Sequence, residues 1–176
     1  MTVTPASAVR YSVNRLTVTV DSTPAEFCSR YERAVPAFPA EQVARLVRRQ
    51  APWQDMIDLM ADTAPLGFTI FYKNDVNAVV RLAGDPSTGV SYLMGNNTVM
   101  ERMFRHEPAV LLFAPLHIVI WGDPGGPGYL TFDRPSDQFS SFANTEVGKV
   151  GAELDQKLTA LLEHLGVSVP DQLRAT

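Results

Sequence analysis

Few side chains in this sequence could carry out chemistry, and the histidines are the first to consider. Histidine titrates near neutral pH and is the most frequent general acid or base in enzymes. The sequence contains three, at His106, His117 and His164. His117 lies in an apolar run that ends at Trp121, where burial beside a polar neighbour would suit it to proton transfer. His117 and His106 are therefore the first two catalytic candidates.

Tyrosine and arginine side chains on neighbouring strands could complete such a site. A phenol or a guanidinium can stabilise the oxyanion that develops on a carbonyl substrate, and Tyr92 is the third catalytic candidate for this reason. Whether two of these side chains share a face of the sheet depends on strand register, which the sequence does not fix. The ligand-binding candidates are Tyr72, Arg81, Met94, Trp121 and Asp133.

Each histidine also has a purely structural explanation. His106 and His164 are expected in the last turns of helices, where the helix dipole favours a cation. His117 could be hydrogen-bonded within the core or within a dimer interface. The sequence contains no HExxH, no paired metal-ligand spacing and no GxSxG elbow. We therefore expect neither a metal site nor another cofactor.

The composition narrows the class of protein. A chain of 176 residues with 45% hydrophobic residues can form one domain with a substantial core. The net charge of −4 argues against a nucleic-acid surface, which needs an excess of Lys and Arg. The single cysteine, Cys28, excludes an internal disulfide. No segment reaches the ~18 apolar residues of a membrane span, and residues 1–13 contain no apolar run of the length that a signal peptide needs. We expect a cytoplasmic protein without nucleic-acid or membrane partners.

The elements that must position the candidate residues are centred on Gly95–Trp121. Thr98 and Glu101 have the spacing of a capping box, which predicts that a helix starts near Asn97. Pro108 disfavours helical geometry at the residue before it, so this helix should end at that point.

The next segment, residues 109–121, predicts a strand because it is rich in β-branched and aromatic residues. Alternate residues of a strand form two faces, and neither face here is polar enough to lie open to water. If helices cover one face, the face of His117 must be covered by a partner subunit, a loop or a small ligand. The two faces are Leu116, Ile118 and Ile120, and His117, Val119 and Trp121.

The rest of the chain adds amphipathic helices and further strands. Thr23 and Glu26 form a capping box, which predicts a helix, and Asn144 is a suitable N-cap for a long last helix that ends at Gly166. Prolines split the segment after the first helix into short helices that could form a covering layer or a lid. Strands are predicted at 11–20, 68–73, 78–82, 90–94 and 129–133, a hairpin connection at 122–128 and a loop at 134–143.

This order of elements predicts an α+β fold. Helices pack on one face of an antiparallel sheet, in a single domain that spans residues 10–170. A flexible leader is expected at residues 1–9 and a tail at residues 171–176.

Four short motifs of the sequence are Gly95-Asn96, Arg105-His106, Ala114-Pro115-Leu116 and Asp133-Arg134-Pro135-Ser136. With these motifs the chain resembles the family known as domain of unknown function 302 (DUF302). The resemblance covers most of the chain from about residue 10. It implies an α+β fold that tends to associate as dimers, and it implies little about activity. Similar proteins often have arginine where this chain has His117, which could mark a site particular to this protein.

Three functions fit these features. The first is a homodimer that binds an apolar, carbonyl-bearing small molecule between the sheet and the helices. The second is a cofactor-independent enzyme of the isomerase, cyclase or lyase type, in which His117 or His106 transfers a proton. The third is a structural homodimer without a ligand. A closed cavity lined by His117 and Trp121 would favour the first two, and a flat, fully paired face would favour the third.

Overall fold

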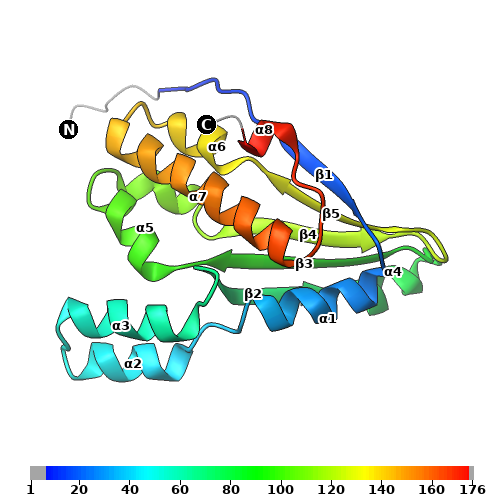
Figure 1. Cartoon of the computed structure of the whole chain (residues 1–176), viewed down its shortest axis with the longest axis horizontal. Helices are drawn as coiled ribbons and strands as arrows, with labels where there is room; N and C mark the ends of the chain where they lie inside the picture. The colour runs from blue at the N-terminus through cyan, green and yellow to red at the C-terminus, as the bar shows by residue number, and fades with distance from the viewer. Residues whose placement is uncertain (1–6, 175–176) are drawn as a thin grey trace, which may run out of the picture.

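Five strands form one antiparallel sheet, as the computed structural model of residues 7–174 describes it (Figure 1). The order across the sheet is β1-β5-β4-β3-β2, so the strand that contains His117 is the central one. The strands are β1 (Arg15–Val20), β2 (Thr69–Asp75), β3 (Thr88–Gly95), β4 (Leu116–Gly122) and β5 (Gly128–Asp133).

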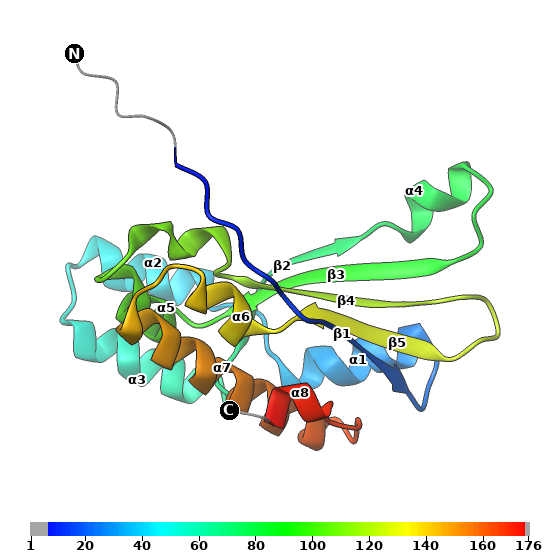
Figure 2. The same cartoon turned by 90° about the horizontal axis from the view of Figure 1, so that it is seen from above.

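Helices cover one face of this sheet. Figure 2 shows α1 (Pro24–Ala34), α7 (Thr145–His164) and α8 (Asp171–Arg174) on the same side of the strands. Alternate residues of β1, β3, β4 and β5 are buried beneath this layer. The predicted α+β class, with an antiparallel sheet, is confirmed. The buried strand residues include Leu16, Val18, Val90, Tyr92, Met94, Leu116, Ile118, Ile120, Leu130 and Phe132.

Local sequence signals determine where two of these helices begin. At α1, the Thr23 side chain accepts a hydrogen bond from the backbone N–H of Glu26, and the Glu26 carboxylate accepts one from the backbone N–H of Thr23. At α7, the side-chain oxygen of Asn144 accepts hydrogen bonds from the first turn. Both predicted helix starts are confirmed.

The central stretch differs from its prediction in two places. Helix α5 (Asn97–Phe104) begins where expected, but its N-cap is Asn96, whose side-chain oxygen accepts a hydrogen bond from the backbone N–H of Thr98 at 2.9 Å. The chain then forms the 3₁₀ helix η1 (Pro108–Leu112). The strand therefore starts only at Leu116, and the prediction that it starts at residue 109 is wrong.

Two short segments are helical, although a strand and a loop are predicted there. Helix α4 (Asn77–Leu82) connects β2 to β3, which pair directly with each other. The Asp75 carboxylate accepts a hydrogen bond from the backbone N–H of Asn77 at 3.0 Å, and this contact favours a turn over extended backbone. Helix α6 (Pro135–Ser140) has proline in its first turn, a position that suits the fixed φ of proline.

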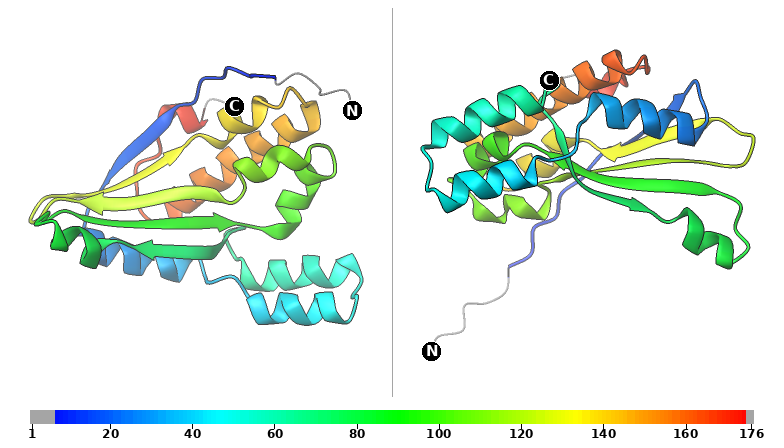
Figure 3. Two further views of the ribbon diagram at one scale, coloured as in Figure 1. Left: turned by 180° about the vertical axis from the view of Figure 1, so that it is seen from behind. Right: turned by 90° about the horizontal axis from the view of Figure 1, so that it is seen from below.

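The helices α2 (Ala40–Arg48) and α3 (Trp53–Thr63) form an antiparallel hairpin beyond the end of the sheet (Figure 3). Met56 and Met60 of α3 are buried, whereas α2 has no buried residue. The helical period predicts that Val47 faces inward, but its side chain is 68% exposed because α2 packs against little besides α3.

Both ends of the described chain contact the core. Leu173 of α8 is buried, so residues that the sequence assigns to a tail are part of the packed domain. The ring of Tyr11 packs edge-on against Phe113, with ring centroids 5.7 Å apart. Residues 1–6 of the expected leader lie outside the described residues. Within residues 7–174, no helix is both long enough and apolar enough to cross a bilayer.

Candidate functional site

Four of the predicted site residues lie on the face of the sheet that is opposite the helices. His117 and Trp121 are exposed on β4. Strand pairing sets Tyr72 opposite Leu93 and Leu93 opposite His117, so Tyr72 shares this face. Asp133 belongs to the same face by alternation along β5. Among the described residues, Figure 2 shows no helix layer here, and we call this surface the open face.

Side-chain contacts order part of the open face. The indole of Trp121 stacks on the ring of Tyr129, with centroids 4.6 Å apart, and its N–H donates a hydrogen bond to Thr131 Oγ1 at 2.9 Å. A depression of about 310 Å³ lies beside these residues and is partly lined by His117. Because His117 and Trp121 are exposed, this depression is not the closed cavity that would favour ligand binding or catalysis on this face.

Tyr92 lies on the other face of the sheet from His117. It pairs with Ile118 of β4 and is fully buried. Its hydroxyl donates a hydrogen bond to Glu32 Oε1 at 2.7 Å, and Lys73 Nζ lies 2.7 Å from the same oxygen. The grouping of Tyr92 with His117 in one catalytic site therefore does not hold, because the sheet separates them.

The environment of Tyr92 fixes its protonation state. Burial raises the pKa of Tyr92 well above its usual value, and hydrogen bonds to Cys28 and Glu32 add to this effect. Burial alone would raise the pKa of Glu32, but hydrogen bonds from Lys73 and Tyr92 outweigh burial, and the pKa lies below the ordinary 4.5. Burial also raises the pKa of the Cys28 thiol. This cluster therefore holds α1 on the sheet as a neutral phenol and an ionised carboxylate.

The remaining candidates lie in other cavities. His106 follows α5, in a cavity of about 180 Å³ beside the ion pair of Arg102 and Glu153. Arg81 lines a cavity of about 410 Å³ at the hairpin end of β4. His106, His117 and Tyr92 therefore share no proton-transfer site. Within residues 7–174, no group of three or more His, Cys, Asp or Glu residues is placed to hold a metal ion.

An apolar pocket of about 270 Å³ lies between the sheet and the helices, where β3 ends and β4 begins. Residues of α5, α6, α7 and η1 complete its walls. Met94 is the one ligand-binding candidate that lines it. Its buried walls include Met94, Val99, Met103, Leu116, Phe139 and Leu154.

Close contacts fix the sheet side of this apolar pocket. The hydroxyl of Tyr31 donates a hydrogen bond to the sulfur of Met94 at 3.0 Å. Gly95 leaves room for the ring of Phe71, because a Cβ at Gly95 would lie 3.2 Å from Phe71 Cε2. The Phe71 ring in turn stacks on Phe38, with centroids 4.4 Å apart. Contacts within the protein therefore hold the side chains of this wall in place.

Two asparagines, Asn96 and Asn97, are among the residues that line the apolar pocket. Asn96 is engaged at both ends of its amide: the oxygen caps α5, and the nitrogen donates a hydrogen bond to the carbonyl of Gly67 at 3.3 Å. The Asn97 side chain makes no hydrogen bond with the part of the chain that the structure describes. Its amide N–H groups are therefore available to donate to an oxygen of a ligand.

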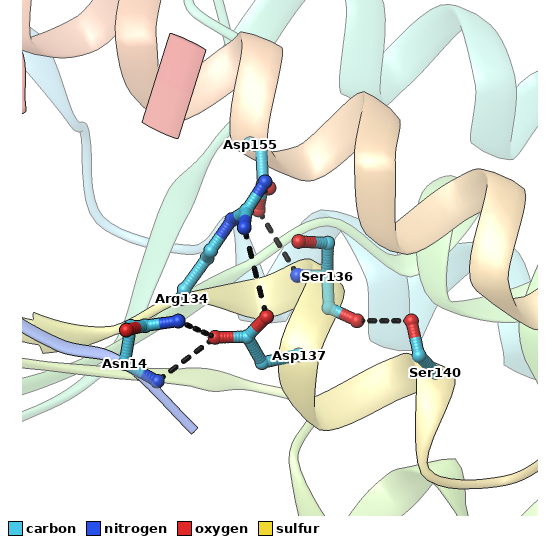
Figure 4. Close-up of polar contacts among 6 residues, drawn as sticks. All are labelled: Asn14, Arg134, Ser136, Asp137, Ser140 and Asp155. Carbon is cyan, nitrogen blue, oxygen red and sulfur yellow. Dashed lines mark hydrogen bonds and ion pairs between the residues drawn. The ribbon is translucent and has the colours of Figure 1, made fainter. Parts of the chain in front are cut away.

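A buried ion pair holds α6, which supplies one wall of the apolar pocket, against α7 (Figure 4). Arg134 Nε donates a hydrogen bond to Asp155 Oδ2 at 2.9 Å, and Asp155 Oδ1 accepts one from the backbone N–H of Ser136 at 3.0 Å. The Asn14 side chain donates to Asp137 at 2.7 Å, which attaches the segment before β1 to α6. These contacts position this wall of the apolar pocket.

A family model that matches most of the chain identifies its family. A family model described as domain of unknown function DUF302 matches residues 49–165. The chain belongs to the DUF302 family. The matched region contains every residue that lines the apolar pocket, and it omits β1, α1 and α2.

A solved DUF302 structure has a similar fold. It is the crystal structure of an uncharacterized conserved protein from Bacillus stearothermophilus, with a TM-score of 0.61. The likeness covers 86% of this chain and 97% of that chain at 16% sequence identity, which shows the fold alone. Among curated proteins, none matches the chain significantly.

The sequence predicts that Met94 contacts a ligand, but it does not predict the apolar pocket. A signal for it is present in the residues that carry the resemblance to DUF302. Gly95-Asn96 and Ala114-Pro115-Leu116 are distant in sequence, yet both motifs line the pocket. The sequence indicates only that a helix starts near Asn97. No residue near Asn97 in the sequence indicates that its side-chain amide lacks a hydrogen-bond partner.

Proposed function

We propose that this DUF302 protein binds a small, mainly apolar molecule that carries a carbonyl group, in the apolar pocket between the sheet and the helices. The observation that carries the proposal is the combination of buried apolar walls with one unengaged amide, that of Asn97. Ligand sites commonly combine an apolar lining with a few polar groups that orient the ligand.

The lining also limits the charge and size of the ligand. None of the lining residues is charged, so a buried carboxylate or ammonium would lose its hydration without gaining an ion-pair partner. A neutral carbonyl oxygen needs only one donor, which Asn97 can provide. The volume of about 270 Å³ lies near the lower end of the usual range for ligand pockets, which begins at roughly 300 Å³, and this favours a small molecule.

Two neighbouring leucines of η1 provide a matched test. Leu111 lines the apolar pocket and is 52% exposed, whereas Leu112 lies outside it and is 76% exposed. Acetophenone, a small neutral ketone, is titrated into the protein and binding is measured by ligand-observed NMR. We expect Leu111→Trp to weaken binding by about tenfold or more, because the indole fills space at the pocket, while Leu112→Trp stays within about twofold of wild type. Equal affinities for the two variants, or no binding to wild type, would refute the proposal.

The open face supports a second proposal, that two copies of the chain pair through it. Trp121 is 36% exposed and Tyr72 is 58% exposed on this face, and large aromatic side chains in one surface are typical of protein interfaces. Sedimentation at micromolar concentration should give twice the mass of the chain. Trp121→Glu should give a monomer, while Trp53→Glu, at an exposed tryptophan of α3, should not change the mass. A monomeric wild type would refute this second proposal.

A further inference from the structure

We infer that the apolar part of the ligand is a single aromatic ring rather than an alkyl chain or a saturated ring. This inference rests on the proposed function, and it names the class of ligand as a one-ring aromatic ketone or aldehyde. The observation behind it is the unusual share of sulfur and aromatic side chains in the walls of the apolar pocket.

Three of the six methionines of the chain line this one pocket: Met94, Met100 and Met103. Thioether sulfurs make favourable contacts with the edges of aromatic rings, and they gain no such contact from saturated carbon. Met94 comes from β3, whereas Met100 and Met103 lie three residues apart on α5 and share a helix face. A ring in the pocket can therefore meet sulfur atoms from both the sheet and the helix.

The sulfur atoms differ in how firmly they are held. Met94 is fully buried, and the hydroxyl of Tyr31 fixes its sulfur. Met103 is 1% exposed, and Met100 is half-buried without a hydrogen-bond partner among the described residues. Because the methionine side chain is unbranched and flexible, Met100 can adjust to the ring, while Met94 provides a fixed contact.

Two phenylalanine rings complete the aromatic character of the walls. Phe71 is held by stacking on Phe38, and Phe139 packs edge-on against Phe113, with centroids 6.2 Å apart. Aromatic pairs prefer offset or edge-on geometry, which a ligand ring can adopt against either wall. The small volume of about 270 Å³ favours one ring over fused rings.

The test compares two ketones of the same carbon skeleton, acetophenone and 1-cyclohexylethanone. The saturated ketone is at least as hydrophobic, so burial of apolar area alone gives it equal or tighter binding. Sulfur and aromatic contacts reverse this order, and we expect acetophenone to bind about three- to tenfold more tightly. The double variant Met100→Leu, Met103→Leu conserves volume and should reduce this preference, while the contacts of Met94, Phe71 and Phe139 preserve part of it.

NMR of methionine methyl groups labelled with ¹³C shows where acetophenone binds. Acetophenone should shift the resonances of Met94, Met100 and Met103 through its ring current, and should leave those of Met56 and Met60 in α3 unchanged. Equal or tighter binding of 1-cyclohexylethanone would overturn the aromatic inference and leave the proposed function intact. A preference that is undiminished in the double variant would overturn the role of Met100 and Met103. If neither ketone binds, both the inference and the proposed function fail.

Discussion

Tyr31 donates its hydroxyl hydrogen to the sulfur of Met94 across 3.0 Å, and both side chains are buried. Tyr31 belongs to α1 and Met94 to β3, so this contact joins the helix layer to a strand that forms one wall of the apolar pocket. A thioether is a weak acceptor, and the contact therefore orients Met94 more than it stabilises the fold.

The first prediction concerns this hydrogen bond. Tyr31→Phe should lower the free energy of unfolding by only about 1 kcal/mol or less, because a typical hydrogen bond contributes this much and the sulfur is a weak partner. Urea denaturation measures this value. The Met94 methyl resonance should shift while those of Met56 and Met60 do not. A loss of more than about 3 kcal/mol would mean that the hydroxyl has a structural role that this account does not include.

The second prediction concerns the polar group of the apolar pocket. Asn97→Asp keeps the shape of the side chain but removes its N–H donors, so acetophenone should bind about five- to tenfold more weakly. The free energy of unfolding should not fall, because an acidic residue in the first turn of α5 interacts favourably with the helix dipole. Asn97→Asp should therefore lower the affinity measured by NMR titration without lowering the free energy of unfolding measured by urea denaturation. Unchanged affinity would remove Asn97 from the binding site.

The third prediction compares two ion pairs of α7. Asp155→Ala removes a fully buried carboxylate that pairs with Arg134 and accepts the backbone N–H of Ser136, and it should cost about 3–5 kcal/mol of stability. Glu153→Ala breaks the pair with Arg102, in which both side chains are more than 40% exposed, and should cost about 0–1 kcal/mol. Urea denaturation of the two variants gives the comparison. Similar losses would show that burial does not set the contribution of these pairs.

The fourth prediction follows from the lowered pKa of Glu32. A carboxylate whose pKa is lower in the folded protein than in the unfolded chain adds stability above the unfolded value, and this stability is lost as the pH falls through the folded value. Glu32→Gln should therefore lower the Tm most above about pH 5, and the difference from wild type should vanish at lower pH. Thermal unfolding at a series of pH values measures this difference. A gap between Glu32→Gln and wild type that widens toward acid pH would have the wrong sign.

The sequence predicts well those elements whose signals are local. The start of α1 depends on Thr23 and Glu26, three residues apart, and the start of α7 depends on Asn144 beside its own first turn. Segment 78–82 has no such signal, and its apolar residues fit either a strand or a short helix. The hydrogen bond from the backbone N–H of Asn77 to the Asp75 carboxylate favours the helix.

The candidate site is harder to predict, because it depends on contacts between segments that are distant in the chain. Whether Tyr92 shares a face with His117 is set by the pairing of β3 with β4, and the pairing puts Tyr92 opposite Ile118 instead. Tyr72 reaches the open face only after an irregularity in β2 between Ile70 and Tyr72. The apolar pocket likewise needs α5, α6 and α7 to meet at the ends of two strands, and no local pattern encodes that meeting.

Chemical-shift mapping of acetophenone on the isotopically labelled protein tests the central claim most directly. We predict that the largest changes occur at methyl groups that line the apolar pocket, such as those of Val99, Met103 and Leu154, with little change at Val119 on the open face. Changes confined to Val119 and Trp121, or no saturable change at all, would contradict the assignment of the ligand site.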